Sequence, residues 1–530
     1  MTTYESSTAL EGLMMRTPLL VSSMAERAGR LFAEREIVSV TATGVERSTW
    51  GEVVRRARRL ASALHELGIR PGDRVATFGW NSVRHVELYL AIPSMGAVLH
   101  TLNIRLFDDD LRYIVAHGED RVIFLDASLA ERMPSFGGTV EHEVLMPDAD
   151  CPREGALDYE ALVASGDDGF TFPELDENCA AAMCFTSGTT GMPKGVVYSH
   201  RSTVLHALFA NQADVLGLRE RDTVLPIVPM FHANAWGMPY AAALAGSKLV
   251  LPGPRMDPAD LAELIARERV TFAGAVPTIW QGVAQLDPRP DLSSVERLLC
   301  GGSAVPESLI RLYDERFGVP ILQAWGMTET SPVASMSRVP PGGPEGDGAY
   351  AIRAMQGRVL PFVEFRADEE AGGELQVRGP TIARSYYRDE SAAEKFTEDG
   401  WLRTGDVAEI EHGAFIKLVD RTKDLVKSGG EWISSVALEN EIMAHPDVLE
   451  AAVVAVPDER WGERPCACVV RRPGGELGAD DLKQFLSTRV AKWWVPERVE
   501  FIAEVPKTSV GKFNKKALRA QLADGTLESA

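Results

Sequence analysis

Between about residue 48 and residue 330, short apolar runs alternate with longer segments in which apolar residues recur every three or four positions. The segment "TWGEVVRRARRLASALHELG" has this helical spacing and ends in a glycine, whereas "DRVATFG" and "RVIFLD" are typical of strands. Helices and strands in turn indicate α/β layers around largely parallel sheets. We therefore expect an α/β fold in this part of the chain.

The pattern changes after Ser337. The segment "RVPPGGPEGDGAY" (338–350) has the composition of a mobile surface loop, and the short strands that follow it predict a small β-rich subdomain. Beyond Asp420 the chain predicts a compact α+β unit of its own. We expect an N-terminal domain of layered α/β subdomains over residues 1–420 and a small C-terminal domain over residues 425–530.

Composition narrows the class of protein. Hydrophobic residues make up 45% and charged residues 25% of the 530 residues, as in a globular protein. The 55 basic and 76 acidic residues give a net charge of −21, which disfavours nucleic acid as a partner. The six scattered cysteines, the absence of a secretory signal and the absence of a run of ~18 apolar residues predict a cytoplasmic protein without a transmembrane segment.

A segment between two predicted strands carries the clearest binding chemistry. "AAAMCF" and "VVYSH" predict strands, and "TSGTTGMPKG" (186–195) lies between them. Its glycines let backbone N–H groups approach oxygen atoms, its hydroxyls add donors and Lys194 adds a positive charge. We interpret it as a phosphate-binding loop, with a polar surface loop as the alternative. It is not a Walker loop, because Pro193 and Gly195 stand where that pattern needs Gly and Ser or Thr.

Three more polar clusters follow predicted strands, where α/β sheets bind ligands. "GGSAVP", after "RLLC", is either a backbone surface for a flat ring or an ordinary turn. "QAWGMTETSP", after the strand "VPIL", offers the Trp325 ring, the Thr328 hydroxyl and the Glu329 carboxylate, which is either a ligand for a hard cation or a solvent-exposed acid. "RTGDVAEI" places Asp406 in a tight turn, where it binds a ribose diol or caps its own backbone.

Two basic residues complete the candidate chemistry. His232, in the apolar "MFHANAW", is either a core histidine or part of a site, and Lys512, in "PKTSVGKFNKKAL", belongs either to a solvated basic tail or to a site. Together the clusters combine a phosphate loop, an aromatic platform, a ribose-type carboxylate, a metal-type carboxylate and two lysines. This combination predicts a nucleoside triphosphate site.

The ordered motifs resemble those of the adenylate-forming superfamily, which comprises acyl-CoA synthetases, luciferases and the adenylation domains of peptide synthetases. "TSGTTGMPKG", "GMTET", "GELQVRG", "RTGD", "DRTKDLVKSGGEWI" and "PKTSVGKF" match in the family's order and cover nearly the whole chain. Within the family, "VPMFHANAWGMPY", "LPGPRMDPADL" and "KSGGEWISSVALEN" are most similar to bacterial medium- and long-chain fatty-acyl-CoA ligases.

The resemblance implies a two-step ligase that uses ATP, Mg²⁺ and coenzyme A. A carboxylate attacks the α-phosphate of ATP, which gives an acyl-adenylate and pyrophosphate, and the thiol of coenzyme A then displaces AMP. Lys512, His232 and Glu329 would be the catalytic residues, with Mg²⁺ at Thr186 and Glu329 and the acyl group at His232, Ala233 and Trp236. ATP or AMP would contact Thr186, Ser187, Gly188, Thr189, Thr190, Gly191, Lys194, Gly302, Ser303, Gln323, Trp325, Gly326, Thr328, Asp406, Arg421, Lys423 and Lys427.

For the second step, the resemblance implies that the C-terminal domain rotates about a hinge at residues 421–424. This motion would withdraw Lys512 and bring in the loop that holds Gly429, Gly430, Glu431 and Trp432 on the coenzyme A side. One position departs from the family's usual pattern, since Trp325 stands where tyrosine is more common. The tryptophan keeps an aromatic face for adenine and loses the hydroxyl.

Other functions compete with this interpretation. A carrier-loading acyl-AMP ligase would normally be followed by a linker and a carrier domain, and the sequence ends in "LADGTLESA". An ATP-binding sensor with a dead site is disfavoured by Lys512, Glu329 and Asp406, whereas a luciferase-type oxygenase would need oxygen. The small residues near Trp236 leave the acyl chain length open, so aryl and short branched acids stay as alternatives. We also expect a homodimer, from the family likeness alone.

Overall fold

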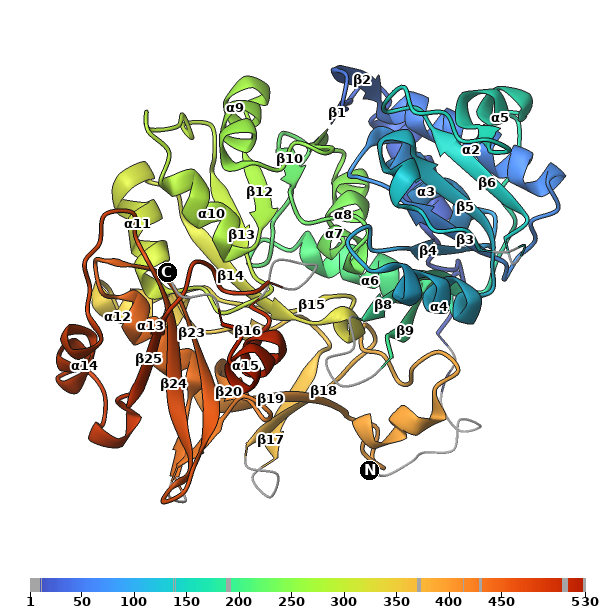
Figure 1. Ribbon diagram of the computed structural model, residues 1–530. Coiled ribbons are helices and arrows are strands. Elements are labelled where there is room, and N and C mark those ends of the chain that lie inside the picture. Colours follow the sequence, from blue (N-terminus) through green and yellow to red (C-terminus); the bar gives the residue numbers. More distant parts are fainter. Residues whose placement is uncertain are drawn as a thin grey trace.

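The computed structural model describes residue 10 and residues 12–136, 138, 140–186, 192–368, 373–412, 414–428, 431–507 and 513–527, without the side chain of Glu431. Two large sheets with helices around them form the upper part of the molecule in Figure 1, and a small sheet and a C-terminal unit lie below them. This arrangement confirms the expected α/β fold class with a β-rich subdomain and a small C-terminal unit. None of the described helices is long and apolar enough to cross a membrane.

The first large sheet has seven strands in the order β7-β6-β5-β3-β4-β8-β9. All neighbours are parallel except the last pair, β8 and β9, which run antiparallel. The strands are β3 (Arg74–Phe78), β4 (Val98–Thr101), β5 (Asp120–Asp126), β6 (His142–Met146), β7 (Leu157–Asp158), β8 (Ala180–Thr186) and β9 (Lys194–Ser199). The antiparallel pair at the edge carries the predicted phosphate loop between its strands.

The second large sheet has nine strands in the order β16-β15-β14-β13-β12-β10-β11-β1-β2. Its central strands are parallel, and β14, β15 and β16 pair antiparallel at one edge. The strands are β1 (Glu36–Val40), β2 (Val45–Thr49), β10 (Thr223–Pro226), β11 (Lys248–Leu251), β12 (Phe272–Ala275), β13 (Arg297–Cys300), β14 (Ile321–Gly326), β15 (Val333–Met336) and β16 (Arg358–Val359).

Helices fill the space between and outside these sheets because their apolar residues share one face or surround the helix entirely. In α2 (Trp50–Glu66) the apolar face is buried and the Thr49 side chain caps the first turn at the Glu52 N–H. Every residue of α3 (Val83–Ser94) except Arg84 is buried. The remaining helices of these two layers are α1 (Val21–Leu31), α4 (Asp108–Gly118), α5 (Tyr159–Ser165), α6 (His200–Ala210), α7 (Ala233–Trp236), α8 (Met238–Ala245), α9 (Pro258–Glu268), α10 (Pro277–Ala284), α11 (Glu307–Phe317) and α12 (Asp347–Arg353).

A four-stranded antiparallel sheet follows the second large sheet, in the order β17 (Glu364–Asp368), β18 (Glu374–Arg378), β19 (Leu402–Glu411) and β20 (Phe415–Arg421). The next strand, β21, already belongs to another sheet, which is built from β21 (Val426–Ser428), β22 (Glu431–Ile433), β23 (Val448–Asp458), β24 (Gly462–Arg471) and β25 (Arg498–Phe501). The helices α13 (Ser435–Met443), α14 (Ala479–Ser487) and α15 (Lys515–Asp524) accompany this C-terminal sheet. The chain therefore changes sheets between Arg421 and Val426.

Three local expectations were wrong. Asp406 lies within β19 and pairs with Arg421 of β20, not in a tight turn, because the positive φ of Gly405 is absorbed within the strand. The strand after "FGVP" runs on through Gln323 and Trp325 to Gly326, since the antiparallel partner β15 extends its ladder. The end of the segment 338–350 forms the start of α12, which an ion pair between Arg311 and Asp347 joins to α11.

Candidate functional site

The β8–β9 hairpin brings the two ends of the predicted phosphate loop together. Thr186 and Lys194 are the last pair of its antiparallel ladder, so they face each other across the loop's base. Ser199 ends β9 and starts α6 with a reciprocal cap, in which its hydroxyl and that of Ser202 each accept a backbone N–H at 3.0 Å. The hairpin is thus anchored at its far end. The predictions at Ser187, Gly188, Thr189, Thr190 and Gly191 lie outside the described residues.

The segment "GMTET" forms a tight connection between β14 and β15. Thr328 and Glu329 lie in a short 3₁₀ helix, Thr328–Thr330, and are only 8% and 6% exposed. The turn is too crowded for any side chain at Gly326, where a Cβ would stand 1.7 Å from the Pro332 carbonyl oxygen. The Tyr198 hydroxyl of β9 donates to the Thr328 carbonyl oxygen at 2.7 Å. This bond joins the candidate phosphate hairpin directly to the candidate metal-binding turn.

The candidate ribose carboxylate is held by three strands. Asp406 of β19 is 5% exposed, and its Oδ2 accepts a hydrogen bond from the indole N–H of Trp325 at 2.9 Å. Its Oδ1 is 3.2 Å from Nε of Arg421 on β20. The indole itself is 6% exposed and packs among apolar residues of the small sheet. The stacking of adenine on Trp325 stays a prediction, while the hydrogen bond to Asp406 gives the tryptophan a positioning role that the sequence did not reveal.

The predicted base-binding residues converge from β13 and β14. Gly302 has a φ of 82° in the turn after β13, and Ser303 next to it is exposed. Gln323 on β14 is 1% exposed, and its Oε1 has no hydrogen-bond partner among the described residues. A buried amide oxygen without a partner is destabilising unless a ligand or water satisfies it. The exocyclic amino group of a nucleobase is a donor of the required kind.

The predicted acyl-binding residues form an unusual backbone turn. Ala233, Asn234, Ala235 and Trp236 have φ values of 43°, 53°, 50° and 55°, and Gly237 follows at 74°. Four consecutive non-glycine residues are therefore left-handed, at a cost of roughly 1–2 kcal/mol each. The local sequence predicts no such turn, although asparagine and glycine, which occur in it, are the residues that tolerate such angles best.

Buried polar contacts stabilise the turn. The Tyr89 hydroxyl donates to the Met230 carbonyl oxygen and lies 3.4 Å from Oδ1 of Asn234, and the Cys184 thiol is 3.5 Å from the same oxygen. Burial raises the pKa of the Cys184 thiol to about 11, so it stays a neutral donor at physiological pH. Strained backbone persists only where its surroundings fix it, and such sites are often functional.

The acyl side and the base side meet at Gly301. A Cβ at this glycine would lie 2.8 Å from the Ala324 carbonyl oxygen and 3.5 Å from Cη2 of Trp236. The Trp236 ring therefore reaches the turn that precedes Gly302. His232 directly precedes the left-handed turn and is half-buried, and its carbonyl oxygen accepts the Ala235 N–H at 3.1 Å. The structure thus brings the candidate acyl residues next to the candidate nucleotide residues.

The predicted residues of the C-terminal part are less closely connected to this site. Within the described residues, no hydrogen bond or ion pair joins Lys427 or Trp432 to the residues above, and the Lys427 ammonium lies 5.3 Å from the Trp432 ring. Burial lowers the pKa of Lys423 at the change of sheets. Gly429, Gly430 and Lys512 lie outside the described residues, as does the side chain of Glu431.

The described residues contain no group of three or more His, Cys, Asp or Glu side chains that could hold a metal ion. The candidate donors for magnesium are one carboxylate, Glu329, and one hydroxyl, Thr186. This donor set fits Mg²⁺, which is commonly bound by one or two carboxylates together with substrate phosphates and water.

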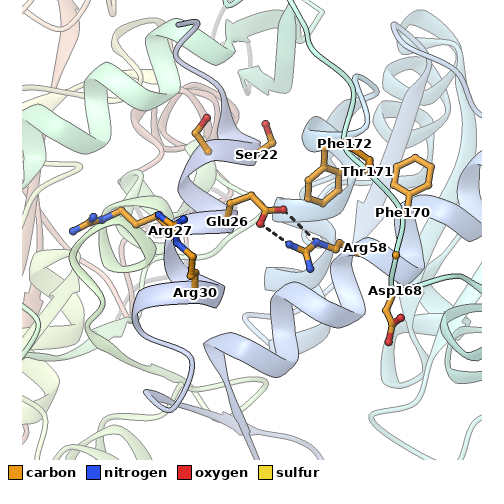
Figure 2. Close-up of a pocket in the computed structure, with 11 residues that line it drawn as sticks. Ser22, Glu26, Arg27, Arg30, Arg58, Asp168, Phe170, Thr171 and Phe172 are labelled. Carbon is orange, nitrogen blue, oxygen red and sulfur yellow. Dashed lines mark hydrogen bonds and ion pairs between the residues drawn. The ribbon is translucent and has the colours of Figure 1, made fainter.

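A separate groove of about 650 Å³ lies between α1, α2 and residues 168–172 (Figure 2). It contains three arginines, but Arg58 is paired with Glu26 and Arg27 donates to the Leu244 carbonyl oxygen. None of the residues that line the groove is among the predicted site residues. We therefore assign the groove no part in the candidate site.

Comparisons with known proteins agree with the motifs. The family model "AMP-binding enzyme" matches residues 25–387, and the model "AMP-binding enzyme C-terminal domain" matches residues 437–512. A medium-chain-fatty-acid–CoA ligase of Ectopseudomonas oleovorans is 42% identical over 98% of this chain and 99% of its own. A long-chain-fatty-acid–CoA ligase of Thermus thermophilus is 46% identical over 98% of each chain. The crystal structure of the anthranilate CoA ligase AuaEII with anthranoyl-AMP has a TM-score of 0.87 at 25% identity, covering 96% of this chain and 99% of that one.

Sequence reasoning missed the residues that connect the motifs. Tyr198, Tyr386 and Asp389 contact the predicted site residues from outside the motifs' own turns. Their only signal in the sequence is position: Tyr198 follows the phosphate loop within the same strand pair, and the other two lie between "GELQVRG" and "RTGD".

We expect Gly326→Ala to lower ATP–pyrophosphate exchange about 100-fold, because the new methyl group must displace the turn that holds Thr328 and Glu329, and a shift of ~1 Å at a reacting centre has an effect of this size. Gly44→Ala, at a site with open space around it, serves as the control. Thermal unfolding of both variants checks the fold. Exchange within twofold of the wild type for a folded Gly326→Ala protein would contradict the geometry.

Proposed function

Because the chain belongs to the family of AMP-binding enzymes and is an AMP-forming acyl-CoA synthetase, we propose that it activates a medium- or long-chain fatty acid at the site built from β8–β9, the Thr328–Glu329 turn and the Trp325–Asp406 pair. The enzyme uses ATP, Mg²⁺ and coenzyme A. The two ligases named above act on medium- and long-chain fatty acids, and they support this substrate class.

One chain of contacts carries the proposal. Lys194 faces Thr186, Tyr198 of the same hairpin binds the Thr328 turn, and β14, which leads into that turn, supplies the Trp325 N–H to Asp406. Strand pairing and hydrogen bonds thus connect the candidate groups for the phosphates, the metal ion and the ribose, although these come from positions as far apart as 186 and 406. The proximity of these three groups is expected for a nucleotide-binding site.

In the proposed adenylation step, a carboxylate oxygen of the fatty acid attacks the α-phosphorus of ATP, and pyrophosphate leaves from the opposite side. Two anions must approach each other, so positive charge that is in place beforehand lowers the barrier. Lys512 would contact the carboxylate and the α-phosphate, and Lys194 the β- and γ-phosphates. Thr328 would donate to the α-phosphate. Mg²⁺, held at Thr186 and Glu329, would neutralise charge on the phosphates.

The proposed nucleoside contacts follow from the same geometry. The Asp406 carboxylate would accept hydrogen bonds from both ribose hydroxyls, and Trp325 and Arg421 orient it. Gly302, Ser303 and Gln323 would frame adenine, and Gln323 supplies the buried acceptor for its amino group. His232, Ala233 and Trp236 would border the acyl group, where the Trp236 ring stands between the acyl side and Gly301.

In the proposed thioester step the C-terminal part rotates about Lys423. The contacts of the neighbouring residues support a hinge at this position. The Thr422 N–H donates to the Gly405 carbonyl oxygen at 3.0 Å, whereas Asp424 is ion-paired with Arg519 of α15. Thr422 therefore contacts the small sheet. Asp424 contacts both parts, since its side chain pairs with Arg519 and its N–H donates to the Arg421 carbonyl oxygen at 2.8 Å. The domain limits of 1–420 and 425–530 with a hinge over 421–424 are part of this proposal.

The experiment that tests the function is AMP release by the purified protein with ATP, Mg²⁺ and coenzyme A, across carboxylic acids from acetate to palmitate and with benzoate. We expect a maximum among the medium- to long-chain acids that requires coenzyme A. A maximum with benzoate would mean that the substrate is an aryl acid and not a fatty acid. Pyrophosphate release without coenzyme A-dependent AMP would indicate a carrier protein as the acceptor.

We expect Lys512→Ala to lower acyl-adenylate formation about 10²–10³-fold, which is the effect of losing one preorganised charge contact in a transition state. The measurement is ATP–pyrophosphate exchange with the best acid. Lys507→Ala, which removes a partly exposed lysine that is paired with Glu450, is the matched control. Exchange that is unchanged in the Lys512 variant would refute the assignment.

We expect Lys423→Pro to slow thioester formation far more than adenylation, because the ring of proline fixes φ at the residue about which the rotation occurs. Single-turnover transfer from preformed acyl-adenylate to coenzyme A measures the second step alone. Lys423→Ala removes the same ammonium group and leaves the backbone free, so its transfer rate gives the contribution of the ammonium group alone. Equal losses in both half-reactions of the proline variant would exclude the hinge.

The cytoplasmic location and the homodimer also remain proposals. The composition and the cysteine pattern support the first, and family likeness supports the second.

A further inference from the structure

A short segment outside the predicted motifs contacts both the candidate phosphate lysine and the candidate metal carboxylate. This segment, Ala383–Asp389, has the sequence "ARSYYRD" and is called the tyrosine strap below. It runs between β18, which lies within "GELQVRG", and β19, which contains "RTGD". Its contacts with Lys194 and Glu329 have no role in the function proposed so far.

At one end, the strap binds the Glu329 residue twice. The Ala383 N–H donates to the Glu329 carbonyl oxygen at 2.7 Å, and the Tyr386 hydroxyl donates to Oε1 of the carboxylate at 2.5 Å. Burial, together with the nearby charge of Glu329, raises the pKa of Tyr386, so the phenol remains a donor. With Oε1 engaged in this way, Oε2 is the carboxylate oxygen left for a cation.

At the other end, the strap binds the hairpin. The Tyr387 N–H donates to the Gly195 carbonyl oxygen at 2.8 Å, and Oδ2 of Asp389 is 2.7 Å from the Lys194 ammonium. The ammonium also lies 5.4 Å from the centre of the Tyr386 ring. The hydrogen bond from Lys194 lowers the pKa of Asp389, which keeps the pair charged. Because an ammonium has three donors, the bond to Asp389 leaves two for a phosphate.

Further contacts fix the strap to the first large sheet. His117 of α4 lies with Nε2 3.2 Å from the Tyr387 carbonyl oxygen, and Arg388 forms an ion pair with Glu119 at 2.5 Å. The strap is thus attached to the hairpin, the Thr328–Glu329 turn and α4 at once. The Lys194 side chain has four rotatable bonds, and its contacts with Asp389 and with the Tyr386 ring order it before any ligand binds.

We propose that the tyrosine strap is a positioning element for the triphosphate of ATP, in which Asp389 orients Lys194 and Tyr386 fixes the carboxylate of Glu329. The inference rests on the proposed nucleotide site. Ordering the two groups in advance removes a cost that ATP binding would otherwise carry. Hydrogen-bonded partners of metal-binding carboxylates typically change metal affinity 10- to 100-fold when they are removed.

The test uses full-length Asp389→Asn, Asp389→Glu, Tyr386→Phe and Lys194→Ala, with Tyr387→Phe as the matched control, because its ring packs edge-on against His117 instead. Titration calorimetry measures binding of α,β-methylene-ATP with and without Mg²⁺, and ATP–pyrophosphate exchange measures KM and kcat. Thermal unfolding checks that each variant is folded.

For the lysine side, we expect Asp389→Asn to weaken binding of the analogue about tenfold and to raise the KM for ATP more than it lowers kcat. Asp389→Glu should restore most of the loss, and Asp389→Asn should add nothing in the Lys194→Ala background. Tighter binding in Asp389→Asn would mean that the carboxylate competes with phosphate, which would overturn the proposal. An equal effect with and without Lys194 would also overturn it.

For the carboxylate side, we expect Tyr386→Phe to raise the Mg²⁺ concentration at half-saturation of analogue binding about tenfold and to leave Mg²⁺-free binding unchanged. An equal loss in Tyr387→Phe, or a loss that does not depend on Mg²⁺, would contradict this role. If Lys194→Ala leaves analogue binding unchanged, the proposed nucleotide site itself is wrong. If Lys194→Ala weakens binding while Asp389→Asn does not, only the strap is excluded.

Discussion

A carboxylate that is removed from water must find donors within the protein, and two such carboxylates organise the candidate site. Glu329 and Asp406 are only 6% and 5% exposed. Glu329 accepts a hydrogen bond from the Tyr386 hydroxyl. Asp406 accepts one from the Trp325 N–H and forms an ion pair with Arg421. Since each donor comes from a different segment, satisfying these two side chains joins β14, β19, β20 and the tyrosine strap. The same two groups are the ones that the proposed chemistry uses for the metal ion and the ribose.

Buried polar groups also stabilise the strained backbone of the candidate acyl-binding turn. The left-handed turn over Ala233–Trp236 has an unfavourable backbone conformation at every residue, and it persists because buried groups from two other elements fix it. Tyr89 belongs to α3 and Cys184 to β8, so the turn is attached to the same strand that leads into the phosphate loop. Contacts with Cys184 therefore link the candidate acyl-binding turn to the candidate phosphate hairpin.

The sequence predicted what local patterns determine. The alternation of short apolar runs and segments of helical spacing predicted the layered α/β fold, and the apolar runs around "TSGTTGMPKG" predicted the strands β8 and β9. The predictions of a turn at Asp406 and of a strand end before Gln323 were wrong, because glycine near a strand favours a turn locally but does not exclude a continuing strand. A long-range partner, β20 for Asp406 and β15 for Trp325, continued the ladder instead. Strand pairing between distant segments overrides local propensity, and one sequence does not reveal it.

Trp325 stands where tyrosine is more common in the family, and its hydrogen bond to Asp406 gives a physical reason for the tryptophan. A tyrosine there would carry its hydrogen-bonding group at the end of the ring, whereas the indole of Trp325 carries its N–H on one edge, and this N–H reaches Oδ2 of Asp406. Asp406 in turn is paired with Arg421, which ends β20 two residues before Lys423. A hydrogen bond and an ion pair therefore connect Trp325, Asp406 and Arg421 in turn. These are the candidate residues for the base and the ribose and the residue where the proposed hinge begins. In the proposed mechanism, a nucleotide at Asp406 would contact the same residue pair from which the proposed rotation of the C-terminal part would begin, so the nucleotide site and the proposed hinge share the Asp406–Arg421 ion pair.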